Sequence, residues 1–215
     1  MPASLDHLVI AGTDLSALIA WWAMSSGLQP AAGGAHGGRG TRNALVGIDN
    51  DSYIELIGPD PEQPNHDGPR PFGINDLEPN SIQLVTFALA VDDLDEATST
   101  VRAAGVDPGR IESMRRLRPD GVELQWRLAI PPDKTFGGTL PFLIEWGADT
   151  PHPATSLSHD CEIESLTLTH PDSETLRTVL VALGLDPQSE KMTIAEGQQS
   201  SVAARLNAPS GSVEL

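Results

Sequence analysis

The strongest constraint on the fold is a pattern that occurs three times along the 215-residue chain. In each copy an alternating apolar stretch ends at an aspartate, and a segment with an apolar stripe follows. The copies begin at residues 5–15 (LDHLVIAGTDL), 82–94 (IQLVTFALAVDDL) and 161–172 (CEIESLTLTHPD). The alternation predicts a strand, and the aspartate predicts the start of a helix. Asp14, Asp93 and Asp172 lie 79 residues apart each time, which is typical of repeated supersecondary units.

Short strands are predicted after each helix, so that each unit has the order βαβββ. They cover 43–48 and 52–57, then 111–118, 122–130 and 140–146, and finally 192–195, 201–207 and 212–215. Proline-containing stretches separate the units and indicate linkers. We therefore divide the chain into a first unit (1–60), a linker (61–80), a second unit (81–150), a linker (151–160) and a third unit (161–215).

Charge and composition disfavour several classes of function. The 30 acidic and 13 basic residues give a net charge of -17, which repels nucleic acid and anionic membrane surfaces. The single cysteine, Cys161, cannot form an internal disulfide and is expected to be a buried structural thiol. No secretory signal pattern is present, and the apolar stretch 18–24 is too short to cross a bilayer. These features predict a cytoplasmic protein.

Two polar residues on predicted strands stand out. His7 is the one residue of the opening strand that strand packing does not explain, and Glu55 lies between apolar residues in YIEL. A buried carboxylate needs a partner, which could be a metal, a substrate, Arg39 or Arg42. On the register of the repeat, Thr86 and Ser165 take the place of His7. The closing strands YIEL, LIEW and SVEL then align Glu55 with Glu145 and Glu214, and Glu214 is interpreted as a relic of the repeat or an edge-strand charge.

The glycine-rich segment GGAHGGRGT (33–41) is predicted to be a turn. It has no lysine after its glycines, so it is not a phosphate-binding P-loop, and GxSxG, HExxH and CxxC motifs do not occur. One interpretation is a flexible connection. The other is a rim that holds an anionic or carbonyl-bearing substrate, formed by His36, Arg39, Arg42 and Asn43. Trp126, between two leucines of one strand, is expected to line a substrate-binding wall or the core, and His152 is a more distant candidate.

In order and spacing, residues 4–170 resemble the vicinal-oxygen-chelate superfamily, and in particular its glyoxalase-like domain branch. The motifs that carry this resemblance are LDHLVIAGTDL (5–15), GG-H-x-G-x-GT-x-N (33–43), YIELIGPDP (53–61), RPDGVELQWRLAIP (118–131) and LPFLIEWG (140–147). The resemblance implies an α+β fold in which repeated βαβββ units form a cup-shaped, mostly antiparallel sheet with helices outside. Units one and two are expected to form the cup, while the third docks beside them or pairs across a homodimer.

The resemblance also implies four metal-ligand positions, which here are His7, Glu55, Thr86 and Glu145. Threonine departs from the family pattern, which leaves one nitrogen and two carboxylates, a set that suits Zn, Mn, Fe, Ni or Co. Glu55 and Glu145 are the candidate catalytic carboxylates, and Thr86 becomes a candidate substrate-binding residue. The predicted function is a metal-dependent lyase, isomerase or dioxygenase acting on a small oxygenated molecule. The alternatives are a metal-free small-molecule binding protein with the same cup and a domain whose site has eroded.

Overall fold

The computed structural model describes residues 3–49, 51–118, 121–132, 136–186 and 191–215. The first unit contains β1 (Ser4–Gly12), α1 (Leu15–Ser26), β2 (Ala31–His36), β3 (Thr41–Gly47) and β4 (Tyr53–Pro59). The second contains β5 (Ile82–Ala90), α2 (Leu94–Ala103), β6 (Ile111–Leu117), β7 (Glu123–Ala129) and β8 (Phe142–Trp146). The third contains β9 (Glu162–His170), α3 (Ser173–Ala182), β10 (Met192–Glu196), β11 (Ser201–Ala208) and β12 (Gly211–Glu214). Two short 3-10 helices, η1 (Pro71–Asp76) and η3 (Pro153–Ser156), lie between the units.

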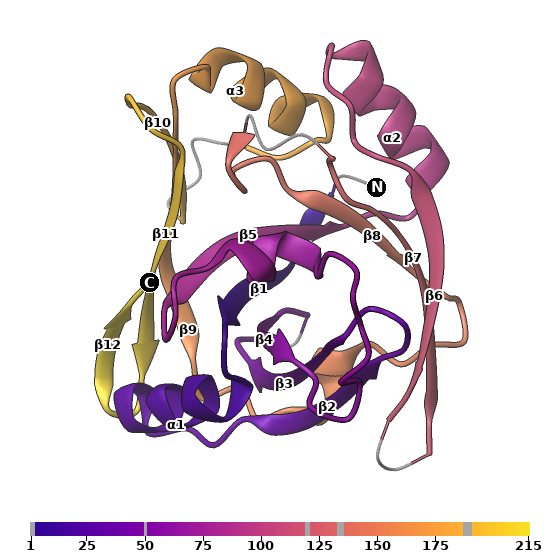
Figure 1. Cartoon of the computed structure of the whole chain (residues 1–215). Helices are drawn as coiled ribbons and strands as arrows, with labels where there is room; N and C mark the ends of the chain where they lie inside the picture. The colour runs from indigo at the N-terminus through magenta and orange to yellow at the C-terminus, as the bar shows by residue number, and fades with distance from the viewer. Residues whose placement is uncertain (1–2, 50, 119–120, 133–135, 187–190) are drawn as a thin grey trace.

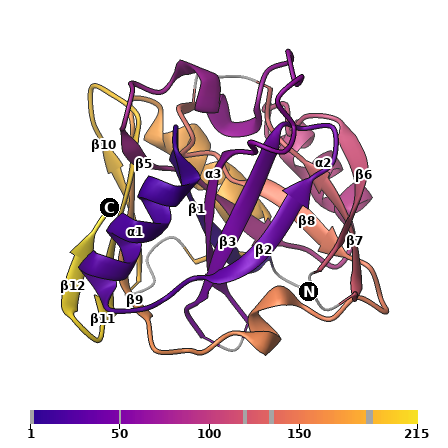
Figure 2. The ribbon, with the colours of Figure 1, turned by 60° about the horizontal axis from the view of Figure 1, so that its bottom comes forward.

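The first two units share one curved eight-stranded sheet with the order β2-β3-β4-β1-β5-β8-β7-β6 (Figure 1). The opening strands β1 and β5 pair antiparallel at its centre, and each also pairs parallel with the last strand of its own unit. Figure 2 shows β2 and β3 of the first unit running side by side, and β2 also contacts β6 of the second unit, so the two ends of the curved sheet approach each other. The predicted α+β fold with a cup-shaped sheet is confirmed.

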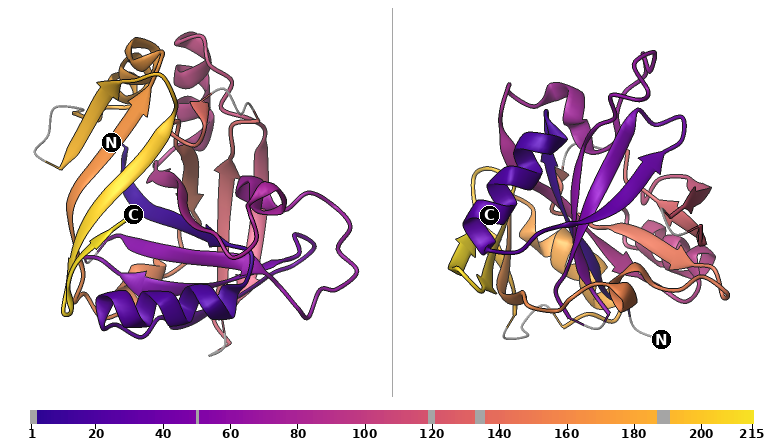
Figure 3. Two further views of the ribbon diagram at one scale, coloured as in Figure 1. Left: turned by 60° about the vertical axis from the view of Figure 1, so that its left-hand side comes forward. Right: turned by 90° about the horizontal axis from the view of Figure 1, so that it is seen from below.

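The third unit forms a separate four-stranded sheet with the order β10-β9-β11-β12 (Figure 3, left). It lies beside the cup, with β11 against β5, β12 against α1 and α3 against α2. Apolar residues from all three units share one core, including Leu8 of β1, Trp22 of α1 and Leu168 of β9. The third unit therefore covers the outer face of the curved sheet.

Side-chain caps explain where the three helices begin. Asp14 accepts hydrogen bonds from the amides of Ser16 and Ala17, and Asp93 and Asp172 each accept one from an amide of the first helical turn. Such caps satisfy amide groups that have no partner inside the helix. The helix α1 ends at Gly27, whose φ of 76° lies in the left-handed region. No described helix is long and apolar enough to span a membrane.

The glycine-rich segment is only partly a turn. Residues Ala31–His36 form β2, an edge strand paired with β3, and the turn is confined to the four residues that follow. Glycines weaken strand propensity, which is why the sequence does not reveal this strand.

Alternation along β1 separates two environments. Leu8 and Ile10 point into the main core, whereas Val9 and Ala11 pack in a smaller cluster on the concave side with Phe142 of β8. His7 has the same parity as Val9 and therefore also belongs to the concave side. This alternation positions the candidate site.

Candidate functional site

His7 is held by its neighbour in the sequence. A register shift between β1 and β5 after Leu5 leaves Asp6 out of the ladder, and the Asp6 side chain lies beside the His7 ring. The Nδ1 atom of His7 is 2.5 Å from Oδ1 of Asp6. The second oxygen, Oδ2, accepts hydrogen bonds from Nε1 of Trp146 at 2.7 Å and from Nε2 of His152 at 3.2 Å. Asp6 thus joins three rings around one fully buried carboxylate.

These contacts set the protonation state of Asp6. Burial alone would raise the pKa of the Asp6 carboxyl, but the hydrogen bonds from His152 and His7 outweigh it and hold this pKa below its usual range. The ionised carboxylate accepts a hydrogen bond from Nδ1–H of His7, and Nε2 of His7 faces the cavity. A carboxylate behind a histidine is also the usual second-shell arrangement of metal-binding histidines.

Glu55 faces His7 from the neighbouring strand. Parallel pairing of β1 with β4 sets Val9 beside Glu55 and His7 beside Tyr53, and the His7 and Tyr53 rings stack with centroids 4.5 Å apart. The Oε2 atom of Glu55 is 3.8 Å from Nε2 of His7. Its Oε1 atom accepts a hydrogen bond from Nδ2 of Asn43 at 2.5 Å and is 3.7 Å from Nε2 of His36. Two imidazole nitrogens therefore flank one buried carboxylate.

The second histidine, His36, is kept neutral. Burial lowers the pKa of His36, and the nearby Glu55 carboxylate raises it only in part. Its Nδ1 atom contacts the hydroxyl of Thr41 at 3.0 Å, and its Nε2 atom lies 3.3 Å from Nδ2 of Asn43, beside Glu55. A neutral imidazole at this position can accept a proton.

Arg116, on β6, contributes the buried positive charge of the site. Its Nη1 donates to Oδ1 of Asn43 at 3.3 Å, while its buried Nε has no described hydrogen-bond partner. Burial lowers the pKa of the Arg116 guanidinium, which nevertheless remains a cation at neutral pH. A guanidinium with an unused N–H group suits an oxyanion or a carboxylate of a ligand.

His7, His36, Glu55 and Arg116 line a cavity of about 70 Å³ on the concave side of the sheet. Most of its remaining wall is apolar or aromatic, from Tyr53, Phe72, Trp126, Phe142, Ile144 and Trp146. Burial strongly raises the pKa of the Tyr53 phenol, with the Asp6 and Glu55 carboxylates adding to the effect. Tyr53 is thus a neutral wall residue and not a base at physiological pH.

The structure brings together part of the predicted site. His7, His36, Arg39, Asn43 and Glu55 line the cavity, together with Trp126. Arg39 forms an ion pair with Glu112 of β6 at the cavity's edge.

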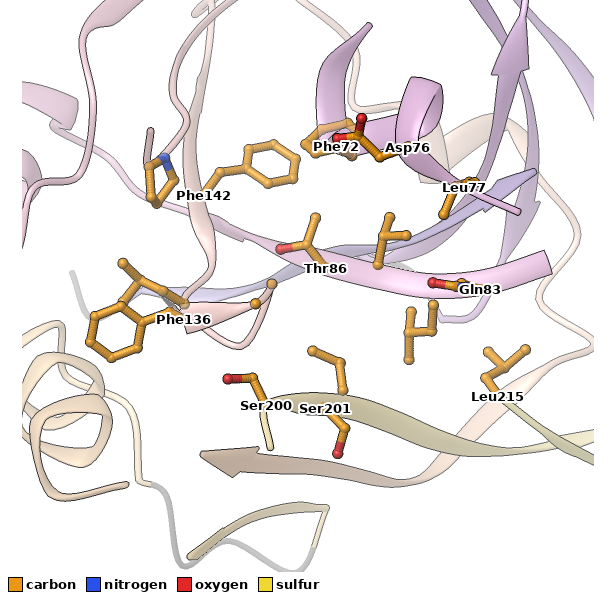
Figure 4. Close-up of a pocket in the computed structure, with 18 of the residues that line it drawn as sticks. Phe72, Asp76, Leu77, Gln83, Thr86, Phe136, Phe142, Ser200, Ser201 and Leu215 are labelled. Atoms are coloured by element: carbon orange, nitrogen blue, oxygen red, sulfur yellow. The ribbon is translucent and has the colours of Figure 1, made fainter. Parts of the chain in front are cut away.

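Two predicted substrate-binding residues do not line the cavity. Arg42 points to the linker, where its Nη1 is 3.5 Å from Asp60 and 3.7 Å from Glu62. Thr86 lines a separate, wider groove beyond Phe142 (Figure 4). The structure therefore separates both residues from the His7–Glu55 pair.

Glu145 is absent from the cavity because it lies on the other face of β8. Alignment of LIEW with YIEL makes Glu145 equivalent to Glu55. In the structure the preceding residue, Ile144, lines the cavity instead.

On the outer face, Glu145 has structural partners. It accepts two hydrogen bonds from Arg127, at 3.1 and 2.6 Å, and one from the amide of Leu94 at the start of α2, at 2.7 Å. The predicted His7–Glu55–Glu145 ligand set is therefore not assembled.

The donors that remain for a metal are fewer than the sequence predicts. Among the described residues, no group of three or more His, Cys, Asp and Glu side chains is arranged to hold a metal ion. Nε2 of His7 and Oε2 of Glu55 are nevertheless 3.8 Å apart, a span that one ion with bonds of about 2.0–2.2 Å can bridge. The donor chemistry of this pair, with Asp6 behind His7, fits a divalent cation whose other ligands come from solvent or substrate.

Several site residues were not predicted. Asp6 gives no alternation signal, because it reaches the site through an irregularity in the strand ladder. Arg116 was missed because it lies on β6, in a part of the sequence where no site residue was predicted. The sequence did offer one hint: HPAT follows the β8 strand closely, and His152 does reach Asp6.

The family model that matches this chain describes a glyoxalase-like domain and covers residues 5–184. The chain belongs to the glyoxalase-like domain family. This match also confirms the predicted relation to the vicinal-oxygen-chelate superfamily. No curated protein sequence matches the chain.

Several solved structures are similar to this glyoxalase-like chain. A hypothetical protein from Staphylococcus aureus has a TM-score of 0.66 at 15% identity, over 93% of this chain and 88% of its own. Methylmalonyl-CoA epimerase from Streptomyces coelicolor has a TM-score of 0.48 at 22% identity, over 69% of this chain and 100% of its own. The epimerase from Mycobacterium tuberculosis has a TM-score of 0.42 at 24% identity, over 66% and 85%. At these identities the likeness concerns the fold alone.

Proposed function

We propose that this glyoxalase-like protein is a metal-dependent lyase or isomerase that acts on a small oxygenated anion in the cavity. The observation that carries the proposal is that Nε2 of His7 and Oε2 of Glu55 face each other at 3.8 Å. The separation is too long for a hydrogen bond, and the Nδ1–H of His7 already serves Asp6. In the tautomer with hydrogen on Nδ1, Nε2 of His7 and Oε2 of Glu55 are both acceptors, and a divalent ion between them would satisfy both.

A divalent ion bound by His7 and Glu55 would supply Lewis-acid polarisation of a substrate carbonyl or hydroxyl. Two neighbouring oxygens on the substrate suit the positions that the protein leaves open. Arg116 is placed to bind a negative charge on the ligand, and its unused Nε supports that role.

Proton movement is assigned to His36. The neutral imidazole borders the cavity, and its Nε2 lies 3.7 Å from Oε1 of Glu55. A base beside a polarised carbonyl favours removal of a proton from the adjacent carbon, a step common to isomerases and lyases. This chemistry is the reason for preferring these two classes to a dioxygenase.

Metal content tests the proposal. We expect purified protein to contain a divalent metal, and His7→Ala and Glu55→Gln to lose it. Glu145→Gln is the matched control, because that carboxylate was predicted as a ligand but lies on the outer face, paired with Arg127. Equal metal content in all four proteins would contradict the proposed site.

The second candidate is a metal-free protein that binds or sequesters a small anion in the same cavity. It is favoured by the lack of a three-residue ligand group among the described residues and by the unused Nε of Arg116. Thermal unfolding separates the two candidates, since a ligand at 100 times its Kd stabilises a protein by about 2.7 kcal/mol. Stabilisation by divalent metal supports the enzyme, whereas stabilisation by small carboxylates alone supports the binding protein.

A further inference from the structure

A second and larger hollow adjoins the site. It is an open groove of about 850 Å³ between the β5 region of the cup and the third unit, with η1 along one side (Figure 4). The groove exists because β8 pairs with β5 only over Ala88–Ala90, so the first part of β5 turns toward β11 instead. Its volume lies within the range of small-molecule binding sites, about 300–1,000 Å³.

The groove and the cavity share a wall. Phe72, Ile130 and Phe142 line both spaces, and the rings of Phe72 and Phe142 are 5.2 Å apart. Figure 4 shows these two rings above Thr86, with Ser200 and Ser201 on the opposite side. A molecule that passes Phe72 would thus have one end beside Glu55 and the other in the groove.

Backbone strain occurs at this shared wall. Phe72 has a φ of 58° and a ψ of 23°, in the left-handed region that non-glycine residues rarely adopt. Strained residues concentrate at ligand clamps and switches, where the surrounding structure holds them in place. The strain marks Phe72 as the residue that a ligand would displace.

The chemistry of the groove selects what it can bind. Its wall is largely apolar, with Trp21, Leu77, Ile82, Phe136 and Leu140 among its residues. The described lining residues include the carboxylates of Asp76 and Glu214 and no lysine or arginine. Such a surface favours an uncharged apolar group and offers no described cation to a phosphate.

The two spaces also differ in size. The cavity of about 70 Å³ is much smaller than the groove of about 850 Å³, so an extended tail fits only the groove. We propose that the groove binds an uncharged alkyl or aryl tail of the substrate, whose oxygenated anionic head lies between His7, Glu55 and Arg116. This inference rests on the proposed function and narrows its substrate class to amphiphilic oxygenated acids without a nucleotide.

Straight-chain 2-oxo acids of increasing length are suitable probes, because they carry neighbouring oxygens, a negative charge and a neutral tail. Calorimetric titration of the metal-loaded protein should show binding that tightens about fourfold per methylene while the tail fills the groove. Gln83→Trp places a large ring in the groove from an exposed position on β5. Gln125→Trp is the matched control, because Gln125 is also exposed on a strand but does not line either space.

We expect Gln83→Trp to bind the shortest acid like wild type and to lose the gain for the longest, while Gln125→Trp keeps both. Affinity that does not depend on chain length, or equal binding of the longest acid by Gln83→Trp and wild type, would overturn the inference. Failure of the proposed function has a different signature. In that case chain-length dependence would persist while Glu55→Gln left both metal content and binding of the shortest acid unchanged.

Discussion

Replacement of Asp6 by asparagine separates the role of its charge from the role of its shape. The carboxylate is fully buried and accepts hydrogen bonds from His7, Trp146 and His152. Each hydrogen bond to a charged group contributes about 1.5–3 kcal/mol. The side-chain oxygen of asparagine can accept one or two of these hydrogen bonds, but its NH₂ group is a donor and faces the remaining N–H donors. Burying a neutral amide costs less than burying a carboxylate, which offsets part of the loss. We expect Asp6→Asn to lower the free energy of unfolding by about 2–3 kcal/mol.

Urea unfolding measures this loss directly, and it corresponds to a fall in Tm of about 4–12 °C for a chain of this size. Asp67→Asn, the same change at an exposed loop position, should stay within about 0.5 kcal/mol of wild type. Asp6→Asn should also bind divalent metal about 10–100 times more weakly, because His7 loses the carboxylate that orients it. Wild-type stability together with wild-type metal affinity in Asp6→Asn would refute this reasoning.

Three further predictions follow from contacts and backbone geometry. Stability should fall on acidification in two stages. The first lies below about pH 6.5, because the pKa of His36 is lowered in the folded state, and the second below about pH 4, because the pKa of Asp6 is lowered. In both cases folding opposes protonation, so the contribution to stability is complete only above the pKa of the unfolded state. The pH dependence of urea unfolding checks this. Asp6→Asn should have a smaller second stage, because the pKa of Asp172, lowered by its hydrogen bonds with Thr175, still contributes. Glu145→Gln should lower the free energy of unfolding by no more than about 1 kcal/mol in urea, since its ion pair with Arg127 is partly exposed. Gly109→Ala should cost more than about 2 kcal/mol, because its φ is +90° and the new Cβ would lie 1.9 Å from the carbonyl oxygen of Ile130. The control Gly105→Ala has a φ of +84° with open space around it, and thermal unfolding should show a loss of only about 1 kcal/mol.

Features that depend on local patterns were predictable from the sequence. The alternation around His7, the capping aspartates and the stop at Gly27 all depend on neighbours within a few residues, and the structure contains each of them. The repeat predicted the order of the elements, and the resemblance to the family implied the cup. The division into units, the homodimer and the cytoplasmic location stay predictions.

Features that depend on strand register were not predictable in the same way. A glutamate one position further along β8 lies on the opposite face of the sheet, so the choice between Ile144 and Glu145 as the partner of Glu55 needs the three-dimensional pairing. Asp6 joins the site only because the ladder shifts after Leu5. Arg116 comes from the far strand of the second unit and meets Asn43 only when the sheet curves.

Anomalous X-ray diffraction from crystals grown with Mn²⁺ or Zn²⁺ tests the central claim most directly, because it locates the ion independently of any activity. The account predicts one strong anomalous peak in the cavity, within about 2.0–2.2 Å of both Nε2 of His7 and Oε2 of Glu55. A peak that avoids this pair, or a cavity without a peak at saturating metal, would contradict the account and leave the metal-free binding protein as the better explanation.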